Sequence, residues 1–295
     1  MNLADLLHDA VDDVEPVDRL GAIRARTSSP ARAARPWWWT AGGVVVATAA
    51  TVAAFAVVGD RSESPGPAGD GHHGHDSQTM LVAAYFVDDT PSGPRLFREF
   101  DEVPAGDPLQ AALERIQRPA SDPDYRTPWS ATSFGEVALH DGVIHVELGD
   151  AVLDDDVAVQ QVVYTLQAAA GERLPVQIGD SSFEAAPQLD VLNLVSISDP
   201  AEGTAYTTDS FVATGRASSF EATVPWELRT EDGETVREGF ATAAGWIDKL
   251  YPWQAEVDVS GLPSGFYTFV ATTADPSGGA EESLLSTDTR TIIVR

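Results

Sequence analysis

An uncharged apolar segment divides the chain near its N-terminal end. WWWTAGGVVVATAATVAAFAVV, residues 37–58, has 22 residues and no charged side chain. At about 1.5 Å per residue, a helix of this length crosses a hydrocarbon core of ~30 Å. A cleaved signal peptide is the alternative, but this segment is longer than a signal peptide's apolar core, and 36 residues precede it. We therefore expect a single transmembrane helix over residues 37–58 that acts as a signal anchor.

The charges beside this segment predict its orientation. Five arginines precede it, and only Arg61 follows closely. Positive residues stay on the cytoplasmic side of a membrane, and tryptophans such as Trp37, Trp38 and Trp39 favour its interface. We expect a single-pass cell-membrane protein with a cytoplasmic tail over 1–36 and extracytoplasmic domains after residue 58.

The excess of acidic residues limits the partners of the chain. The formal net charge is −28, from 46 acidic and 18 basic residues. Such a chain repels nucleic acids and anionic lipid headgroups over most of its surface, which argues against a DNA-binding role, so we expect no nucleic-acid partner. The chain also has no cysteine. Thiol catalysis, thiolate metal sites, disulfides and a lipid-bearing cysteine are therefore excluded.

The predicted cytoplasmic tail has one amphipathic pattern. Leu3, Leu6, Leu7, Ala10 and Val14 recur at helical spacing. A short helix here could bind a cytoplasmic regulator, as the cytoplasmic ends of membrane-bound anti-sigma factors do. It could equally have no partner, because isolated helices of this length are marginally stable.

A spacer rich in glycine, proline and histidine covers residues 59–78. Its Gly, Pro and Ser content is typical of a flexible linker. His72, His73 and His75, with Asp70 and Asp76, are residue types that bind zinc, copper or nickel. A structural metal site needs ligands fixed on an ordered frame, so we expect a solvated spacer and assign no metal ligand.

Residues 79–188 alternate predicted strands and helices. Asp107 and Pro108 are a helix start signal, and Asp141-Gly142 is a hairpin turn signal. We expect Asp156 to cap a second helix that Gly171 ends. The predicted strands are 80–87, 95–103, 134–140, 142–148 and 174–178. The expected product is an α+β domain with helices on one face of a mixed sheet.

This part of the sequence resembles a known domain family. AYFVDD, PLQAALERI, DGVIHVELGDA and QQVVYTLQA together resemble the GerMN domain of bacterial sporulation and spore-germination proteins. The resemblance implies a role in protein assembly. Within the same stretch, His140 and His145 lie beside a tight turn without a third ligand, which favours a surface pair. Asp154, Asp155 and Asp156 lack the alternating pattern of a calcium loop, so helix capping explains them better.

Residues 189–295 have the pattern of an all-β domain. Seven predicted strands separated by turns favour an immunoglobulin-like sandwich. They cover 190–198, 210–217, 221–230, 234–243, 253–260, 266–274 and 288–295. We expect Trp226 to lie in the core and Tyr267, at the start of the penultimate strand, to form a tyrosine corner.

Glu221 and Glu227 in SSFEATVPWELR raise the question of a glycosidase acid pair. Strand alternation places Ala222, Val224, Trp226 and Leu228 on the core face and both glutamates on the solvent face. At ~3.3 Å per residue the glutamates are about 20 Å apart, whereas glycosidase carboxylates need roughly 5 to 9.5 Å. The two glutamates are therefore predicted to be surface residues.

The same stretch carries the second resemblance. GRASSFEATVPWELRTEDGETVREGFATA and LPSGFYTF are similar to the immunoglobulin-like module found beside GerMN domains in bacterial germination-type proteins. The two resemblances favour a non-enzymatic envelope protein that binds other envelope proteins or peptidoglycan. We assign no catalytic, cofactor-binding or metal-binding residue, and we expect no cofactor.

Two other functions stay open. The outer domains could sense a signal while the N-terminal helix holds a cytoplasmic regulator. The protein could instead bind or hydrolyse wall carbohydrate, with aromatic side chains as stacking candidates. These candidates are Trp129, Trp246, Tyr251 and Trp253.

Overall fold

The computed structural model describes residues 78–275 and 285–295. All of them belong to one compact unit, Thr51–Arg295. The predicted membrane helix over 37–58, the amphipathic segment in the tail and His72, His73 and His75 lie outside the described residues. Among the residues that are described, no helix is long and apolar enough to cross a membrane.

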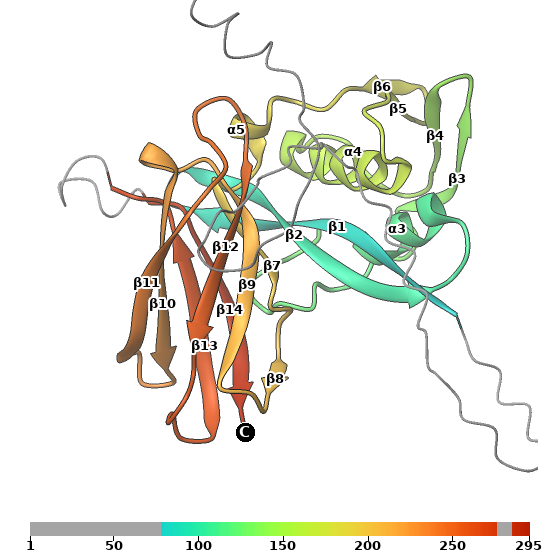
Figure 1. The fold of residues 1–295 in the computed structure, drawn as a ribbon. Helices are drawn as coiled ribbons and strands as arrows, with labels where there is room; N and C mark the ends of the chain where they lie inside the picture. Colours follow the sequence, from blue (N-terminus) through green and yellow to red (C-terminus); the bar gives the residue numbers. More distant parts are fainter. Residues whose placement is uncertain (1–77, 276–284) are drawn as a thin grey trace, which may run out of the picture. The chain divides into compact units, whose positions relative to one another are not determined.

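The first half of the described chain, which we call the α+β part, contains strands and helices in alternation (Figure 1). Its elements are β1 (Thr79–Thr90), β2 (Gly93–Pro104), α3 (Pro108–Ile116), β3 (Phe134–His140), β4 (Val143–Leu148), α4 (Asp156–Ala170), β5 (Val176–Ile178), β6 (Ser181–Phe183) and α5 (Gln188–Val191).

The α+β part has two separate sheets, so the expectation of one mixed sheet is wrong. β1 and β2 pair only with each other, as an antiparallel hairpin whose strands have 12 residues each. The second sheet has the order β3-β4-β5-β6, and β4 and β5 are parallel. The sequence could not predict this arrangement, because the alternation of side chains along a strand does not indicate which strands pair.

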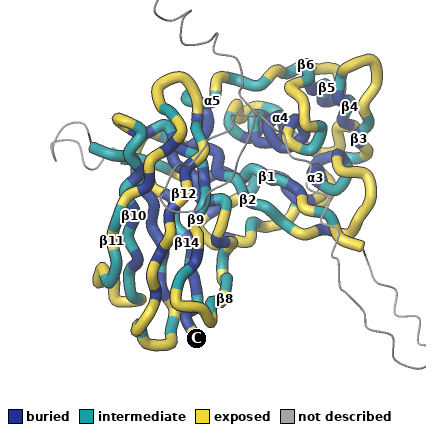
Figure 2. The backbone as a smooth tube through the Cα atoms, viewed as in Figure 1, coloured by how far each residue is buried: buried dark blue, intermediate teal, exposed yellow. Residues whose placement is uncertain are grey.

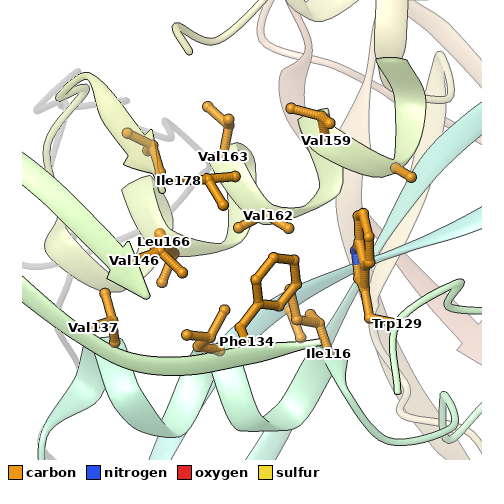
Figure 3. Packing of buried hydrophobic residues seen from close by; sticks show 14 of the residues in the cluster. Ile116, Trp129, Phe134, Val137, Val146, Val159, Val162, Val163, Leu166 and Ile178 are labelled. Atoms are coloured by element: carbon orange, nitrogen blue, oxygen red, sulfur yellow. The ribbon is translucent and has the colours of Figure 1, made fainter. Parts of the chain in front are cut away.

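One apolar core joins both sheets to α3 and α4. In Figure 3, Val162 and Leu166 of α4 lie beside Phe134 and Val146 of the second sheet. The hairpin contributes Ala84, Phe86 and Phe97 to the same cluster. The helical spacing of the apolar residues in α4 explains this packing, because residues three and four apart share one helix face.

The ends of both long helices follow local rules. The Asp107 side chain accepts hydrogen bonds from the backbone N–H groups of Leu109 and Gln110, at 2.9 and 3.0 Å. For α4 the cap is Asp155, whose carboxylate accepts from Val157 and Ala158, so the prediction of Asp156 was wrong by one residue. Gly171 ends α4 with a φ of 69°, as predicted. A positive φ there costs glycine little.

The second half of the described chain is a β-sandwich, which Figure 1 draws in yellow to red. One sheet has the order β11-β10-β13-β14-β8, and the other has the order β12-β9-β7. The strands are β7 (Val195–Asp199), β8 (Thr204–Tyr206), β9 (Ser210–Ala217), β10 (Thr223–Thr230), β11 (Thr235–Thr242), β12 (Tyr251–Asp258), β13 (Gly265–Thr272) and β14 (Thr287–Val294).

Alternation of side chains builds the core of this sandwich, and Figure 2 shows buried and exposed residues alternating along its strands. Val224, Trp226 and Leu228 of β10 are buried, as predicted. The hydroxyl of Tyr267 on β13 donates to the backbone carbonyl of Pro263 at 2.8 Å. This bond is the predicted tyrosine corner.

The starts of β7 and β10 and the short strand β8 differ from the sequence prediction. The expected strand over 190–198 begins at Val195, because α5 and the chain after it precede β7. β10 begins at Thr223, because Phe220–Ala222 forms a short 3-10 turn in which Glu221 and Ala222 have φ values of 51° and 59°. β8 has three residues and was missed, since a run this short carries no readable alternation.

Candidate functional site at the junction of the two parts

A buried arginine of the β-sandwich lies against a loop of the α+β part. Arg290, on β14, places its Nη1 2.8 Å from Asp122 Oδ2, and the two side chains are 3% and 2% exposed. The same Nη1 lies 3.0 Å from Asp288 Oδ1 and 2.6 Å from the hydroxyl of Tyr125. Asp122 and Tyr125 belong to the segment between α3 and β3. Side chains far apart in the sequence thus form one ionic group, which we call the junction cluster: Asp122, Tyr125, Asp288 and Arg290.

The junction cluster is also bonded to strand β7. Asp288 Oδ2 accepts from the backbone N–H of Ile197 at 2.6 Å, and Arg290 Nη2 donates to the carbonyl of Ile197 at 3.2 Å. The Tyr125 hydroxyl donates to Asp288 Oδ1. β14 and β7 lie in different sheets, so the cluster connects both sheets of the sandwich with the α+β part.

Burial sets the protonation of this cluster. It raises the pKa of Asp122 to about 7, against the opposing effects of the Asp124 N–H and the Arg290 charge. The pKa of Tyr125 lies well above its usual value because of burial and the nearby Asp288 charge. Burial opposes the charge on Arg290, but Asp288, Tyr125 and Asp122 outweigh it and raise the pKa of the arginine. One fixed cation, Arg290, therefore serves two carboxyl groups, those of Asp122 and Asp288.

A second ionic group orders the start of the same loop. Arg115 lies 3.1 Å from Glu99 and 2.8 Å from Asp101. Glu99 also accepts from the backbone N–H groups of Ser121 and Asp122, at 3.0 and 2.7 Å. Burial raises the pKa of Glu99, and those backbone bonds oppose the shift. The hairpin residue Glu99 thereby fixes the backbone at Asp122.

Apolar side chains and a small cavity complete the junction. Leu250 of the sandwich packs with Val87, Leu96 and Tyr164 of the α+β part and with Leu192, which follows α5. Beside this cluster lies a cavity of about 60 Å³ whose lining includes Arg98 and Arg216.

Residues 288–295, DTRTIIVR, contain a pattern from which part of the junction cluster could have been predicted. Alternation along β14 places Asp288 and Arg290 on the same face as Ile292 and Val294, and all four are buried. Charged residues on the core face of a strand predict a buried ionic group. The partners of these charges could not be read in this way, because Asp122 and Tyr125 lie in an irregular segment.

The two glutamates considered from the sequence, Glu221 and Glu227, have different surroundings. Glu221 lies in the 3-10 turn before β10, so the predicted separation along one strand does not apply to it. Glu227 lies 2.8 Å from Arg229 Nε and accepts from the Thr235 hydroxyl at 2.8 Å. The bonds from Arg229 and Thr235 lower the pKa of Glu227.

The histidines at the β3–β4 turn do lie near each other. The ring centroids of His140 and His145 are 6.2 Å apart. In the described parts of the chain, no group of three or more His, Cys, Asp or Glu residues is arranged to hold a metal ion. Asp155 of the triple-aspartate run is accounted for by helix capping.

The four aromatic stacking candidates have different surroundings. Trp129 and Trp253 are buried in the two cores, so they are unavailable to a ligand. The hydroxyl of Tyr251 donates to Asp248 at 2.6 Å. Trp246 is 38% exposed and packs edge-on against Phe220, which is 41% exposed, with 5.4 Å between the ring centroids.

Comparison with protein families identifies both halves. Residues 83–179 match the family described as sporulation and spore germination, and residues 194–280 match the immunoglobulin-like domain of bacterial spore germination. The chain carries a GerMN domain followed by a spore-germination immunoglobulin-like domain. The predicted family resemblances are thus confirmed. The junction cluster joins Asp122 and Tyr125, within the residues matched to the GerMN family, to β14 of the sandwich.

Solved structures and curated proteins add little to this assignment. The tandem GerMN domains of the sporulation protein GerM from Bacillus subtilis are 16% identical over 62% of this chain and 63% of that chain, with a TM-score of 0.32. An engineered protein solved by crystallography is 18% identical over 50% of this chain and 29% of its own, with a TM-score of 0.24. The chain thus spans less than two thirds of each of these structures. No curated protein is significantly similar in sequence.

Proposed function

We propose that the protein is a single-pass, membrane-anchored, non-enzymatic cell-envelope protein whose GerMN and immunoglobulin-like domains together bind other envelope proteins. The observation that carries this proposal is the junction cluster. Arg290 of one domain and Asp122 of the other are paired out of contact with solvent. Such a pair opposes separation of the domains, because separating them would leave buried charges without partners. The two domains would therefore offer one fixed surface to a partner.

The apolar segment over 37–58 supports the membrane anchor. Its length fits a bilayer, and the arginines before it favour a cytoplasmic N-terminus. The linker over 59–78 would hold the domains away from the membrane surface. Alkaline extraction of membranes from cells expressing the full chain tests the anchor. We expect the protein to stay in the membrane pellet, and release into the supernatant would contradict the anchor.

Crosslinking in the native membrane tests the binding role. The full chain is crosslinked in cells, and its neighbours are identified by mass spectrometry. A matched control keeps residues 1–78 and lacks the two domains. We expect a set of extracytoplasmic proteins with the full chain that the control does not recover. Identical neighbours for both proteins would contradict binding through the domains.

A second candidate function, binding of wall carbohydrate, is favoured by the exposed pair of Trp246 and Phe220. Flat aromatic faces can stack against sugar rings. Co-sedimentation of the full chain with purified peptidoglycan tests this candidate. Trp246→Ala should reduce pelleting, whereas Phe240→Ala, which removes a 71% exposed aromatic side chain elsewhere, should not. Equal pelleting of both variants and the wild type would contradict carbohydrate binding through Trp246. Release of soluble wall fragments would contradict the proposal that the protein is not an enzyme.

The signalling alternative depends on the tail before the membrane segment. Leu6→Ala together with Leu7→Ala removes part of its predicted apolar stripe. If the tail binds a cytoplasmic regulator, affinity purification of the full chain should lose that regulator in the double variant. Recovery of the same cytoplasmic proteins from both would contradict this alternative.

A further inference from the structure

The cavity at the junction has room for more than one water molecule. Its volume is about 60 Å³. One water requires only about 10–15 Å³ of such a cavity, so a few waters or one small ion would fit. The polar residues that line it come from both domains, and none of the lining residues within 78–275 and 285–295 is an aspartate or a glutamate. The polar residues are Tyr85, Arg98, Gln188, Asn193, Ser196 and Arg216.

Arg216 carries a charge that the described residues leave unbalanced. Its Nε and Nη2 both donate to the backbone carbonyl of Leu250, at 3.3 and 2.9 Å. None of the ion pairs found within 78–275 and 285–295 includes this residue. Burial lowers the pKa of Arg216, and the positive charge of Arg98 lowers it further. The cavity therefore favours a negatively charged occupant.

Arg98 has a donor that no described group uses. Its Nη2 donates to the Ser198 hydroxyl at 2.9 Å, and its Cζ lies 4.6 Å from the centre of the Phe100 ring. These contacts hold the guanidinium group in one orientation. Its Nε is buried without a hydrogen-bond partner among the described residues. A buried donor without a partner is destabilising, which makes an acceptor in the cavity favourable.

Asn193 offers the complementary group. Its Nδ2 donates to the carbonyls of Val195 and Thr287, at 2.8 and 3.0 Å, and these two bonds fix the orientation of the amide. The residue is 1% exposed, and its Oδ1 has no partner within the described chain. An occupant that satisfies this oxygen must donate a hydrogen bond.

We propose that this cavity binds one small oxyanion that also carries a hydroxyl group, as hydrogen phosphate does. The charged oxygens accept hydrogen bonds from Arg98 and Arg216, and the hydroxyl donates to Asn193 Oδ1. Planar guanidinium groups suit phosphate oxygens, and hydrogen bonds between charged groups are the stronger kind. Because residues of both domains line the cavity, the bound anion stabilises their junction. This proposal is independent of the proposed envelope function.

Calorimetric titration of the full chain in detergent, at neutral pH and constant ionic strength, tests this site. The probes are inorganic phosphate, sulfate and acetate. We expect saturable binding of one phosphate and weaker binding of sulfate, which carries no proton at this pH. Arg98→Gln and Arg216→Gln should each weaken phosphate binding by about ten-fold or more, as expected for the loss of a charge-assisted hydrogen bond. Arg229→Gln is the matched control, because Arg229 pairs with Glu227 outside the cavity.

Several results would overturn the proposal. One is an absence of saturable phosphate binding to the wild type, and another is an equal loss of affinity in Arg229→Gln. Sulfate binding as tight as phosphate binding would contradict the role of Asn193. If Arg98→Gln fails to fold, Arg98→Lys replaces it. This variant keeps the charge but lacks the Nε donor, so it should still weaken binding. Unchanged phosphate affinity in Arg98→Lys would then contradict the proposal.

Discussion

Arg290 Nη1 lies 2.8 Å from Asp122 Oδ2, although the two residues are 168 positions apart in the sequence. Both side chains are almost completely buried. Because Arg290 is on the last strand and Asp122 is in the loop after α3, this pair connects the GerMN domain to the end of the immunoglobulin-like domain. Removal of one member of such a pair leaves the other as an uncompensated buried charge.

The first prediction concerns Arg290→Met. Methionine occupies similar space but leaves Asp122, Asp288 and Tyr125 without their shared cation. We expect the free energy of unfolding to fall by about 3–5 kcal/mol, the usual cost of breaking a buried pair. Urea unfolding of the full chain, followed by tryptophan fluorescence, measures the change.

Arg229→Met is the control for this prediction. It removes an arginine from a largely solvent-accessible pair with Glu227, so it should cost no more than about 1 kcal/mol. Arg290→Met combined with Asp122→Asn should cost less than the sum of the single changes, because the second change removes one of the stranded charges. Equal costs for Arg290→Met and Arg229→Met would contradict the structural role of the junction cluster.

The second prediction is a pH dependence that belongs to Asp122. Its pKa is about 7 in the folded protein, above the ordinary aspartate value of 3.8. Between these two values the folded state binds a proton that the unfolded state does not, so this contribution to stability is greatest at low pH and is lost as the pH rises to about 7. The shift corresponds to a contribution of a few kcal/mol.

Asp122→Asn removes this titration. We therefore expect the wild type to lose stability relative to Asp122→Asn as the pH is raised from about 4 to about 7, with no further relative change above that range. Urea unfolding at a series of pH values measures the difference. Glu231→Gln, which removes one exposed acid, is the control, and a flat difference between the wild type and Asp122→Asn would contradict the assignment.

The third prediction concerns the tyrosine corner. Tyr267→Phe removes only the hydroxyl that donates to the Pro263 carbonyl at 2.8 Å. We expect a loss of about 1 kcal/mol, typical of one intramolecular hydrogen bond. Thermal unfolding of the full chain measures it. Tyr206→Phe is the matched control, because the Tyr206 ring is half-buried and stacks on Phe211 with 4.5 Å between the ring centroids. An equal loss of stability in Tyr206→Phe would contradict a special role for the tyrosine corner.

Local features of this fold could be read from the sequence because neighbouring residues determine them. Asp107 and Gly171 each act through contacts within one helical turn. Trp226 is buried because strand alternation decides its face. The sequence could not decide between Asp155 and Asp156 as the helix cap, because both carry a carboxylate that can accept the same hydrogen bonds. The backbone conformation at the start of α4 makes Asp155 the cap.

The junction could not be read in the same way, because it depends on contacts across long sequence separations. Arg290 was not singled out from the sequence, and nothing near it in the sequence indicates that Asp122 is its partner. The separation of the β1–β2 hairpin from the other sheet could not be predicted either, because it depends on which strands pair with each other. Trp129 and Trp253 were stacking candidates from the sequence, and packing against distant residues places them in the cores.

The fourth prediction tests a close backbone approach at the centre of the sandwich. A Cβ atom on Gly215 would lie 1.9 Å from the Ser196 carbonyl oxygen and 2.6 Å from the Trp253 ring. Neither neighbour can move freely, because Ser196 is in the adjacent strand β7 and Trp253 is buried.

Gly215→Ala should therefore push β9 away from β7. We expect it to lower the free energy of unfolding by about 1–3 kcal/mol or more, as overpacking of a core does. Gly106→Ala is the matched control, because a Cβ there meets no atom within 4 Å. Urea unfolding of both variants gives the comparison. If Gly215→Ala is as stable as Gly106→Ala, then β7 and β9 do not approach each other as closely as the structure shows.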